Sequence, residues 1–319
     1  MAWIFVALGL VTLLLAGDFL VRGAVNLALR LGISALLVSL TVVAFGTSAP
    51  ELLIVLSAMA DGASGLAMGN VIGSNTANIL LVLGLPALIA GLHTADFFPK
   101  KSFLLMILAT VLFIGLAFWG PFTWWHGGIL LAVLLCILWD QGRSAQRDRQ
   151  AAKTAALVAV EEDGLEGVDP TMPGWKIALY LMFGLVGLPI GARVLVVNAE
   201  LIAKDYGVPE TAIGLTLIAV GTSLPELATT TIAAFRRQGD VALGNVIGSN
   251  MFNLLAIIGI AAFVAPIPVD AAFLRFDLWI MLAASLLLFP MVFFKINFTR
   301  MWGAGLTLLY MAYLFVVLL

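Results

Sequence analysis

"GTSAPE", residues 46–51, places a proline and a carboxylate inside a long apolar run, and the near copy "GTSLPE" does so again at residues 221–226. When the chain is shifted by 175 positions, residues 46–80 align with residues 221–255 without a gap, and 17 of the 35 positions are identical. The identities include Gly, Ser, Thr, Pro, Glu and Asn, which unrelated apolar helices would not share. The stretch therefore indicates an internal duplication.

The composition around these motifs is that of an integral membrane protein. Of the 319 residues, 62% are hydrophobic and 11% are charged, and the mean hydropathy is +1.12. A water-soluble protein of this length needs far more polar surface. The ten-residue alternating pattern of a membrane barrel does not occur, so we predict an all-α bundle of about ten transmembrane helices. The predicted spans are 2–22, 33–58, 64–91, 102–119, 127–139, 175–203, 211–235, 240–265, 271–294 and 301–319.

The duplication divides these spans into two halves of five helices. We predict a first repeat at 1–139, a cytoplasmic linker at 140–174 and a second repeat at 175–319. Because an odd number of spans separates equivalent helices, the two repeats have inverted topology. With both termini outside, 13 of the 16 Lys and Arg residues lie on the inner side, as the positive-inside rule requires. This arrangement predicts a multi-pass protein of the cell membrane, inner or plasma.

Several classes of function are excluded by what the chain lacks. The two histidines and the single cysteine, Cys136, form no metal-binding or disulfide pattern. No basic cluster suits nucleic acid, and no glycine-rich loop suits a nucleotide. No nucleophile with a base, and no pair of catalytic aspartates, stands out as an enzyme site. We therefore predict a membrane protein that is not an enzyme and needs no cofactor and no obligatory protein partner.

The repeated prolines affect the backbone next to the glutamates. Pro50 has no N–H and its ring crowds the carbonyl of Gly46, so the helix should kink and free backbone oxygens around residues 43–47. Such oxygens are tolerated inside a membrane where they line a cavity or find partners. Helical spacing places Thr47 and Ser48 on the same face as Glu51. The second repeat has the same arrangement in Thr222, Ser223, Pro225 and Glu226.

The following helix of each repeat carries a stripe of polar residues. Asn70, Ser74 and Asn78 occur at intervals of four, and Asn245, Ser249 and Asn253 repeat them. The pairs Gly69/Gly73 and Gly244/Gly248 permit close helix packing, which would bring each stripe against a glutamate helix. Any single Ser, Thr or Asn here could instead serve only as a contact between helices or bond to its own backbone.

The two glutamates decide the chemistry of the predicted site. Neither motif helix contains a Lys or Arg to pair with Glu51 or Glu226. A carboxylate buried in a membrane is costly, so it must take up a proton or hold a cation. The surrounding ligands are all oxygen, which suits a hard cation. Ca²⁺ takes about six to eight oxygens in flexible geometry, whereas Mg²⁺ requires a strict octahedron and retains its waters.

The paired motifs resemble the two alpha-repeats of the sodium/calcium exchanger family, in the calcium/cation antiporter superfamily. "GTSAPE" with "GNVIGSNTAN" and "GTSLPE" with "GNVIGSNMFN" carry the resemblance, together with the flanks "LGISALLVSLTVVAFGTS" and "YGVPETAIGLTLIAVGTS". The resemblance covers essentially the whole chain. It implies two inverted five-helix repeats and alternating access, in which the first and sixth helices slide across the ion-binding core. By matching positions it implies a cation site made by the side chains of Glu51, Glu226, Thr47, Ser48, Ser74, Asn78, Thr222, Ser223, Ser249 and Asn253, and by the backbone oxygens of Ala44 and Ala219.

One position departs from the family pattern. Several relatives, including potassium-dependent ones, carry Asp where this chain has Asn253. The departure leaves two acidic ligands and argues against potassium dependence. The leading hypothesis is a secondary antiporter that exchanges Ca²⁺ for Na⁺. The alternatives are a proton/calcium exchanger that uses the same glutamates and, less well suited to inverted halves in one chain, a passive cation channel.

Overall fold

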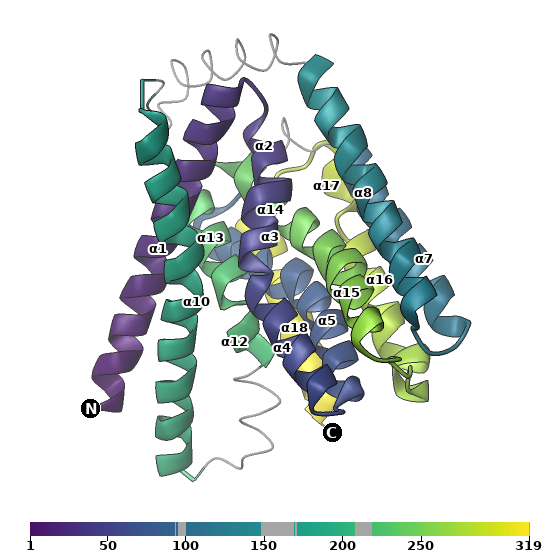
Figure 1. Ribbon diagram of the computed structural model, residues 1–319. Coiled ribbons are helices and arrows are strands. Elements are labelled where there is room, and N and C mark those ends of the chain that lie inside the picture. Colours follow the sequence, from purple (N-terminus) through teal and green to yellow (C-terminus); the bar gives the residue numbers. More distant parts are fainter. Residues whose placement is uncertain (93, 95–99, 148–168, 170, 208–218, 319) are drawn as a thin grey trace.

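Helices form nearly all of the described structure, a computed structural model that covers residues 1–92, 94, 100–147, 169, 171–207 and 219–318 (Figure 1). The first half contains α1 (Ala2–Leu31), α2 (Ala35–Val38), the π-helical turn η1 (Ser39–Val43), α3 (Ala44–Thr47), α4 (Ala49–Ala60), α5 (Ser64–Ala77), η2 (Asn78–Val82), α6 (Gly84–Ala90), α7 (Lys100–Phe118) and α8 (Trp124–Arg147). The second contains α10 (Gly174–Asp205), α12 (Ala219–Thr222), α13 (Leu224–Phe235), α14 (Gly239–Met251), η4 (Phe252–Ile257), α15 (Ile258–Val264), η5 (Phe273–Asp277), α16 (Leu278–Leu286), α17 (Phe289–Phe294) and α18 (Arg300–Leu318).

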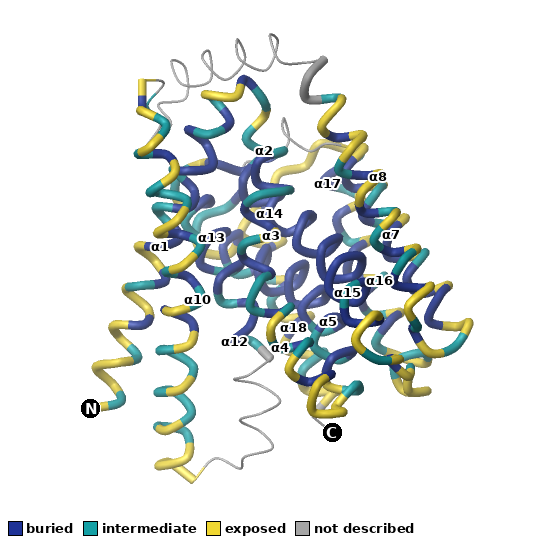
Figure 2. Tube along the Cα trace, viewed as in Figure 1, coloured by how far each residue is buried: buried dark blue, intermediate teal, exposed yellow. Residues whose placement is uncertain are grey.

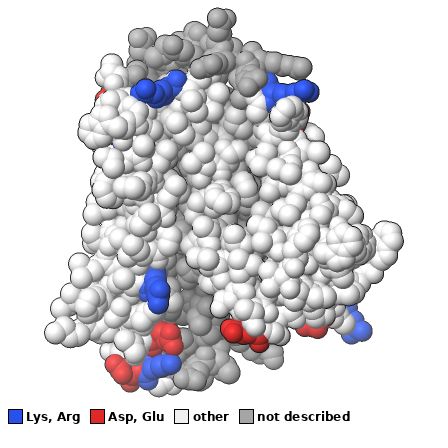
Figure 3. Space-filling view, viewed as in Figure 1, with Lys and Arg blue, Asp and Glu red and all other residues white. Residues whose placement is uncertain are grey.

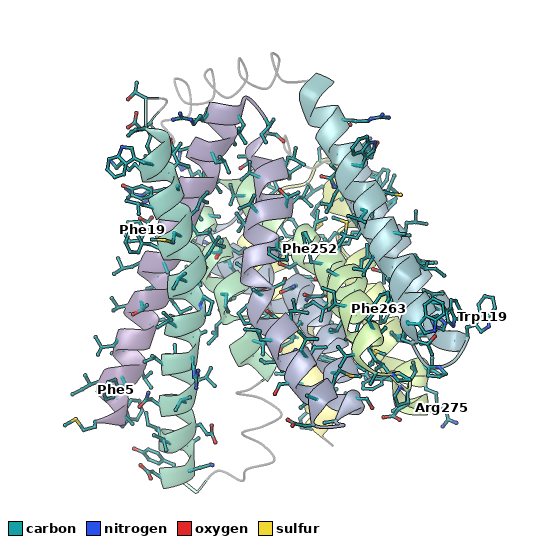
Figure 4. The ribbon with its side chains drawn as sticks, viewed as in Figure 1. Phe5, Phe19, Trp119, Phe252, Phe263 and Arg275 are labelled. Carbon is teal, nitrogen blue, oxygen red and sulfur yellow. The ribbon has the colours of Figure 1, made fainter. Side chains whose placement is uncertain are left out.

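The surface of this bundle suits a lipid bilayer. Nine helical segments of the described ranges are long and apolar enough to cross a membrane. Residues 211–218 of the predicted seventh span lie outside those ranges. Charged side chains gather towards the two ends of the face shown in Figure 3, and uncharged surface lies between them. All eight tryptophans are exposed, and Trp119 projects outward at the same end of the bundle as Arg275 (Figure 4), as expected for residues at a membrane interface. The all-helical membrane fold is confirmed.

The first and sixth spans form a separate layer on one side of the bundle. α1 and α10 run antiparallel (Figure 1), and glycines allow their backbones to approach closely. A Cβ on Gly9 would lie 2.7 Å from the backbone nitrogen of Leu195, and one on Gly184 would lie 2.5 Å from Cβ of Leu20. The two contacts are equivalent, because Gly9 and Gly184 are 175 positions apart, as are Leu20 and Leu195. Leu13, Leu20 and Leu188 belong to a hydrophobic cluster distinct from the main core.

The same offset of 175 appears in the connections between helices. Gly32 ends α1 with φ 67°, and its counterpart Gly207 also has a positive φ, 76°. Leu92 pairs with Phe298 through two backbone hydrogen bonds of 2.9 and 3.1 Å. Ile267, the counterpart of Leu92, pairs in the same way with Phe122. The duplicated sequence therefore folds as two equivalent halves related by inverted topology.

Several predicted spans differ from the helices observed. α1 continues past residue 22 to Leu31, because residues 23–31 are mostly apolar and favour a helix, and the left-handed Gly32 then ends it. The predicted short fifth span, 127–139, is part of the 24-residue helix α8, which continues to Arg147 and so includes the start of the predicted linker. Residues 148–168 and 170 of that linker lie outside the described ranges.

The second, third and eighth spans are interrupted helices. The second is divided into α2, η1, α3 and α4, the third is divided by η2, and the eighth is divided by η4. Pro86 has no N–H to donate to the carbonyl of Val82 at the end of η2. The proline is not the cause of the π-helical turn, because η4 forms at the equivalent place in the second repeat, where residue 261 is Ala. η2 begins at Asn78 and η4 contains Asn253, both predicted site residues. These segments lie in the most deeply buried part of the bundle (Figure 2).

Candidate cation-binding site

Each GTS-x-PE motif forms a break between two helices. Ser48 has φ −83° and ψ 0°, and Ser223 has φ −88° and ψ 5°, so both leave the helical conformation. Each proline stands in the first turn of the next helix, where an N–H would have no helical partner. The motif was predicted to kink one continuous helix. Instead, one helix ends before the serine and a second helix begins after it. The carbonyl of Ala44 is not freed, since it accepts the N–H of Ser48 at 3.0 Å and lies 3.3 Å from Oγ1 of Thr47.

The break places both glutamates in the first turn of a helix. Glu51 lies in the first turn of α4 and Glu226 in that of α13, and both side chains are 0% exposed. The unpaired N–H groups of a helix N-terminus favour negative charge at this position. The ion pairs found in the described part of the chain include neither glutamate. The two carboxylates do interact electrostatically with each other.

Glu226 is surrounded by hydroxyl groups from both halves. Ser48 donates through Oγ to Oε1 of Glu226 at 3.4 Å, and the hydroxyls of Thr47 and Ser249 also interact with this carboxylate. Nδ2 of Asn245 donates to the backbone oxygen of Glu226, also at 3.4 Å. The first repeat thus supplies polar groups to the glutamate of the second.

The other glutamate has a different environment. Neither carboxylate oxygen of Glu51 has a hydrogen-bond partner among the described residues. Ser223 is the counterpart of Ser48, yet its Oγ also lacks a partner in that part of the chain. The hydrogen bond between Ser48 and Glu226 therefore has no equivalent between Ser223 and Glu51. Two nearly identical motifs therefore have nearly the same backbone angles but different side-chain hydrogen bonds.

Glycines of α14 bring its polar stripe against the first repeat. A Cβ on Gly248 would lie 2.5 Å from the backbone oxygen of Leu40, and one on Gly244 would lie 2.7 Å from that of Leu36. At this separation Oγ1 of Thr47 lies 3.1 Å from Oδ1 of Asn245. The close packing predicted for Gly244 and Gly248 is confirmed. For Gly69 and Gly73, the equivalent partner segment is 208–218, outside the described residues.

Buried oxygens without partners mark the centre of the bundle. The equivalent helices of both repeats contribute them. Nine buried side-chain oxygens of the described residues have no partner, and two of them, Oδ1 of Asn75 and Oγ1 of Thr94, belong to residues outside the predicted site. The other seven belong to predicted site residues: Oε1 and Oε2 of Glu51, Oε2 of Glu226, Oγ of Ser74 and Ser223, and Oδ1 of Asn78 and Asn253. Ca²⁺ takes about six to eight oxygens in flexible geometry, so a set of this size can supply them. The described chain holds no group of three or more His, Cys, Asp and Glu side chains, so neutral oxygens must supplement the two carboxylates. The donor set fits a hard cation.

The other predicted residues also lie in this region of the structure. Thr222 is buried at the end of α12, and Ser249 is buried on α14 beside Thr47, 3.4 Å from it between hydroxyl oxygens. Ala219 begins α12, and only its backbone is described. Asn75 and Asn250, which were not predicted as site residues, form hydrogen bonds between the two repeats. The sequence did indicate these two residues, because both belong to the stretch "GNVIGSN" that is identical in the two repeats.

This arrangement, inverted helical repeats around buried acidic and neutral oxygens, defines a membrane transporter for cations. A model of the sodium/calcium exchanger protein family matches residues 1–141 and 176–319. The chain belongs to the sodium/calcium exchanger family, whose members are antiporters and not enzymes.

Individual relatives resemble the chain over nearly its full length. It is 38% identical over 91% of its length to the putative antiporter CaxA of Alkalimonas amylolytica, covering 89% of that protein. It is 31% identical over 99% of its length to the sodium/calcium exchanger MaX1 of Methanosarcina acetivorans, covering 98% of it. The solved structure of the sodium-calcium exchanger NCX_Mj, soaked with Na⁺ and Ca²⁺, aligns with a TM-score of 0.80 at 28% identity, covering 98% of this chain and 96% of that one.

Proposed function

We propose that this protein exchanges Ca²⁺ for Na⁺ across the cell membrane, with both ions bound in turn at the site around Glu51 and Glu226. The observation that carries the proposal is the pair of fully buried carboxylates, whose oxygens Oε1 and Oε2 of Glu51 and Oε2 of Glu226 lack partners among the described residues. A negative charge without a partner in a low-dielectric interior requires a counter-ion. The names of MaX1 and NCX_Mj support Na⁺ and Ca²⁺ as that pair of ions.

The ligand set follows the residues predicted above. Glu51 and Glu226 supply charge, and Ser74, Ser223, Asn78 and Asn253 supply neutral oxygens. Thr47, Ser48, Thr222 and Ser249, with the backbone oxygens of Ala44 and Ala219, complete the proposed set. The oxygen of Ala44 already accepts the N–H of Ser48, so it would use its second lone pair for the ion. The unequal environments of Glu51 and Glu226 support alternating access, because exchanging the conformations of the two repeats would turn the site towards the opposite side. The ions are transported substrates, and the proposal includes no resident cofactor.

A proton/calcium exchanger is the second candidate, and the same buried carboxylates favour it. Either glutamate could be neutralised by a proton in place of a cation. The two candidates share every ligand and differ only in the ion that drives calcium movement.

The deciding experiment is uptake of radioactive calcium into proteoliposomes that contain the purified protein. We expect an outward Na⁺ gradient to drive uptake, and an outward K⁺ gradient of the same size not to drive it. Uptake driven by an outward H⁺ gradient and indifferent to Na⁺ would establish the second candidate. Protein-free liposomes serve as the control, and uptake under none of the gradients would contradict antiport of calcium altogether.

The proposed orientation places both termini outside the cell and the segment 140–174 in the cytoplasm. It is supported by the distribution of basic residues between the two sides. Asp61 ends α4 and Arg237 follows α13, so inverted repeats place them on opposite sides. In a Cys136→Ala background, Asp61→Cys is expected to react with an impermeant thiol reagent applied to intact cells, and Arg237→Cys only after permeabilisation. Labelling of both from the same side would contradict the proposed topology.

A further inference from the structure

Two asparagines outside the proposed ligand set join the repeats at the centre of the bundle. Nδ2 of Asn75 donates to the backbone oxygen of Asn250 at 3.2 Å, and Nδ2 of Asn250 donates to the backbone oxygen of Asn75 at 3.3 Å. Each residue is 1% exposed. They are 175 positions apart, so they are equivalent residues that bond reciprocally about the axis relating α5 and α14.

Asn250 makes one further bond that Asn75 does not. Its Oδ1 accepts Nδ2 of Asn78 at 3.1 Å, and Oδ1 of Asn78 has no partner among the described residues. The equivalent bond would join Nδ2 of Asn253 to Oδ1 of Asn75, and both atoms lack partners in the same part of the chain. The –NH₂ group of Asn78 therefore donates a hydrogen bond to Asn250, whereas the –NH₂ group of Asn253 has no partner among the described residues.

We infer that Asn250 is a positioning residue that turns the amide of Asn78 so that its oxygen faces the cation. An amide presents either an oxygen or an –NH₂ group, and only the oxygen is a ligand for a hard cation. Because Asn250 occupies the –NH₂ of Asn78, the oxygen is the atom left for the ion. In the opposite conformation Asn75 performs the same task for Asn253. This inference rests on the proposed function, since it concerns the same site.

The test is a double-mutant cycle in calcium-exchange assays. Asn250→Ala is expected to raise the half-saturating Ca²⁺ concentration about tenfold and to change the maximal rate less than about threefold, because one orienting bond is lost. In an Asn78→Ala background, Asn250→Ala should raise the half-saturating Ca²⁺ concentration by less than a further factor of about two, since its effect acts through Asn78. Asn250→Leu, which is closer in volume, replaces the alanine variant if that protein does not fold.

Thr76→Val is the matched control, because Thr76 is buried one residue from Asn75 and, among the described residues, its hydroxyl donates to the carbonyl of Ile72 within its own helix at 3.1 Å. It should leave the half-saturating concentration unchanged. An unchanged value in Asn250→Ala, or multiplicative losses in the double variant, would overturn the inference while wild-type exchange persists. Absence of exchange in the wild type would instead contradict the proposed function.

An independent observation concerns the charged residues of the layer formed by α1 and α10. Asp18 of α1 forms an ion pair with Arg236, which directly follows α13, and a second pair with Arg22 at 2.9 Å. The side chains of Asp18 and Arg236 are 24% and 12% exposed. Charged residues within a membrane helix are costly and mark functional positions. The pair ties the α1–α10 layer to the core helix that carries Glu226.

The packing around this ion pair is unequal between the two repeats. A Cβ on Gly17 of α1 would lie 3.3 Å from the backbone oxygen of Ala228, so α1 rests directly on α13. Ala228 is 7% exposed, whereas its counterpart on α4, Leu53, is 69% exposed. At the equivalent place in the first repeat, the face of α4 is therefore open.

At the positions equivalent to Asp18 and Arg236 in the other repeat, the acid and the base are exchanged. Asp18 corresponds to Arg193 of α10, and Arg236 corresponds to Asp61 at the end of α4. Both Arg193 and Asp61 are exposed, and neither takes part in an ion pair found in the described part of the chain. The duplication has thus kept an acid and a base at equivalent positions with their signs reversed.

We propose that the two acid–base pairs form alternately during the transport cycle, and that each stabilises one of its two conformations. Asp18 and Arg236 close one end of the bundle in this conformation. In the opposite conformation, Arg193 and Asp61 close the other end as the α1–α10 layer slides. Because each pair stabilises a different conformation, exchange requires each pair to form and break in turn.

The proposal is tested with cysteine pairs in a Cys136→Ala background. A short bis-methanethiosulfonate reagent, which spans part of the length of the removed Arg and Asp side chains, is expected to crosslink Asp18→Cys with Arg236→Cys, and separately Arg193→Cys with Asp61→Cys. Either crosslink should stop exchange until its disulfides are reduced. The charge reversal Asp18→Arg with Arg236→Asp should recover at least about half of the rate lost in either single variant. Glu200→Gln is the control, because the pair between Glu200 and Lys204 lies within α10 and joins no two helices.

Two results would overturn this proposal. One is continued exchange with the Asp18–Arg236 cysteine pair fully crosslinked. The other is the absence of any crosslink between positions 193 and 61 in protein that still exchanges calcium.

Discussion

Replacing either Glu51 or Glu226 by Gln is expected to lower the calcium-exchange rate at least about a hundredfold while the protein still folds. Glutamine keeps the size and one oxygen of the side chain but removes the charge that a divalent cation needs. Taking one charge from a buried ionic cluster costs about 3–5 kcal/mol, which corresponds to roughly two to four powers of ten in an equilibrium constant. Both side chains are 0% exposed, so water cannot compensate for the loss.

Radioactive calcium uptake into proteoliposomes measures this effect, and size-exclusion chromatography verifies the fold. Asp140→Asn is the matched control, because Asp140 pairs with Lys101 at the surface and its side chain is 51% exposed. Exposed ion pairs contribute less than about 1 kcal/mol, so this variant should exchange calcium like the wild type. Normal flux in either glutamine variant would rule out that glutamate as a calcium ligand.

Gly248→Leu is expected to abolish the folded protein. The Cβ alone would lie 2.5 Å from the backbone oxygen of Leu40 and 2.5 Å from Cβ of Ala44. These are contacts with helix backbone and with a side chain that has no rotamer to change, so α14 would have to separate from η1 and α3. Overpacking a close-packed core costs about 1–3 kcal/mol even where neighbours can move, and separating these helices also breaks the contact between Thr47 and Asn245.

Fluorescence-detected size-exclusion chromatography of a fusion protein measures the yield of monodisperse material. Gly115→Leu is the control, since a Cβ on Gly115, on the exposed face of α7, would meet no described atom within 4 Å. That variant should match the wild-type yield. A monodisperse Gly248→Leu protein would show that α14 can move away from the first repeat without loss of the fold.

The sequence alone determined the class of this protein, its duplication and the two acidic residues at its centre. Composition decides membrane insertion, because water cannot solvate so much apolar surface and a lipid bilayer can cover it. The duplication is visible because the two copies share polar residues that a membrane span otherwise avoids, such as Glu51 and Glu226. Carboxylates without basic partners in an apolar segment predict a cation site for a related reason, since a buried negative charge needs a counter-ion or a proton.

The form of the helix breaks could not be predicted from local rules. A proline permits either a kink in one helix or the first turn of a new one, and the choice depends on the neighbouring helices. At Ser48 and Ser223 a new helix begins, and the carbonyl of Ala44 keeps its hydrogen bond. The extent of α1 to Leu31 was also not predicted, because the span was ended at Arg22 although residues 23–31 are mostly apolar and the helix ends at Gly32.

Only the tertiary structure decided how the two repeats differ. Their motifs are nearly identical, so the sequence pattern assigns both the same environment. In the folded chain Ser48 bonds to Glu226 while Ser223 and Glu51 lack partners among the described residues, and α1 covers Ala228 while Leu53 stays exposed. Inverted repeats permit two packings related by exchange of the halves, and the structure holds one of them. That choice depends on contacts between residues far apart in the chain, such as Asp18 with Arg236, which no local pattern encodes.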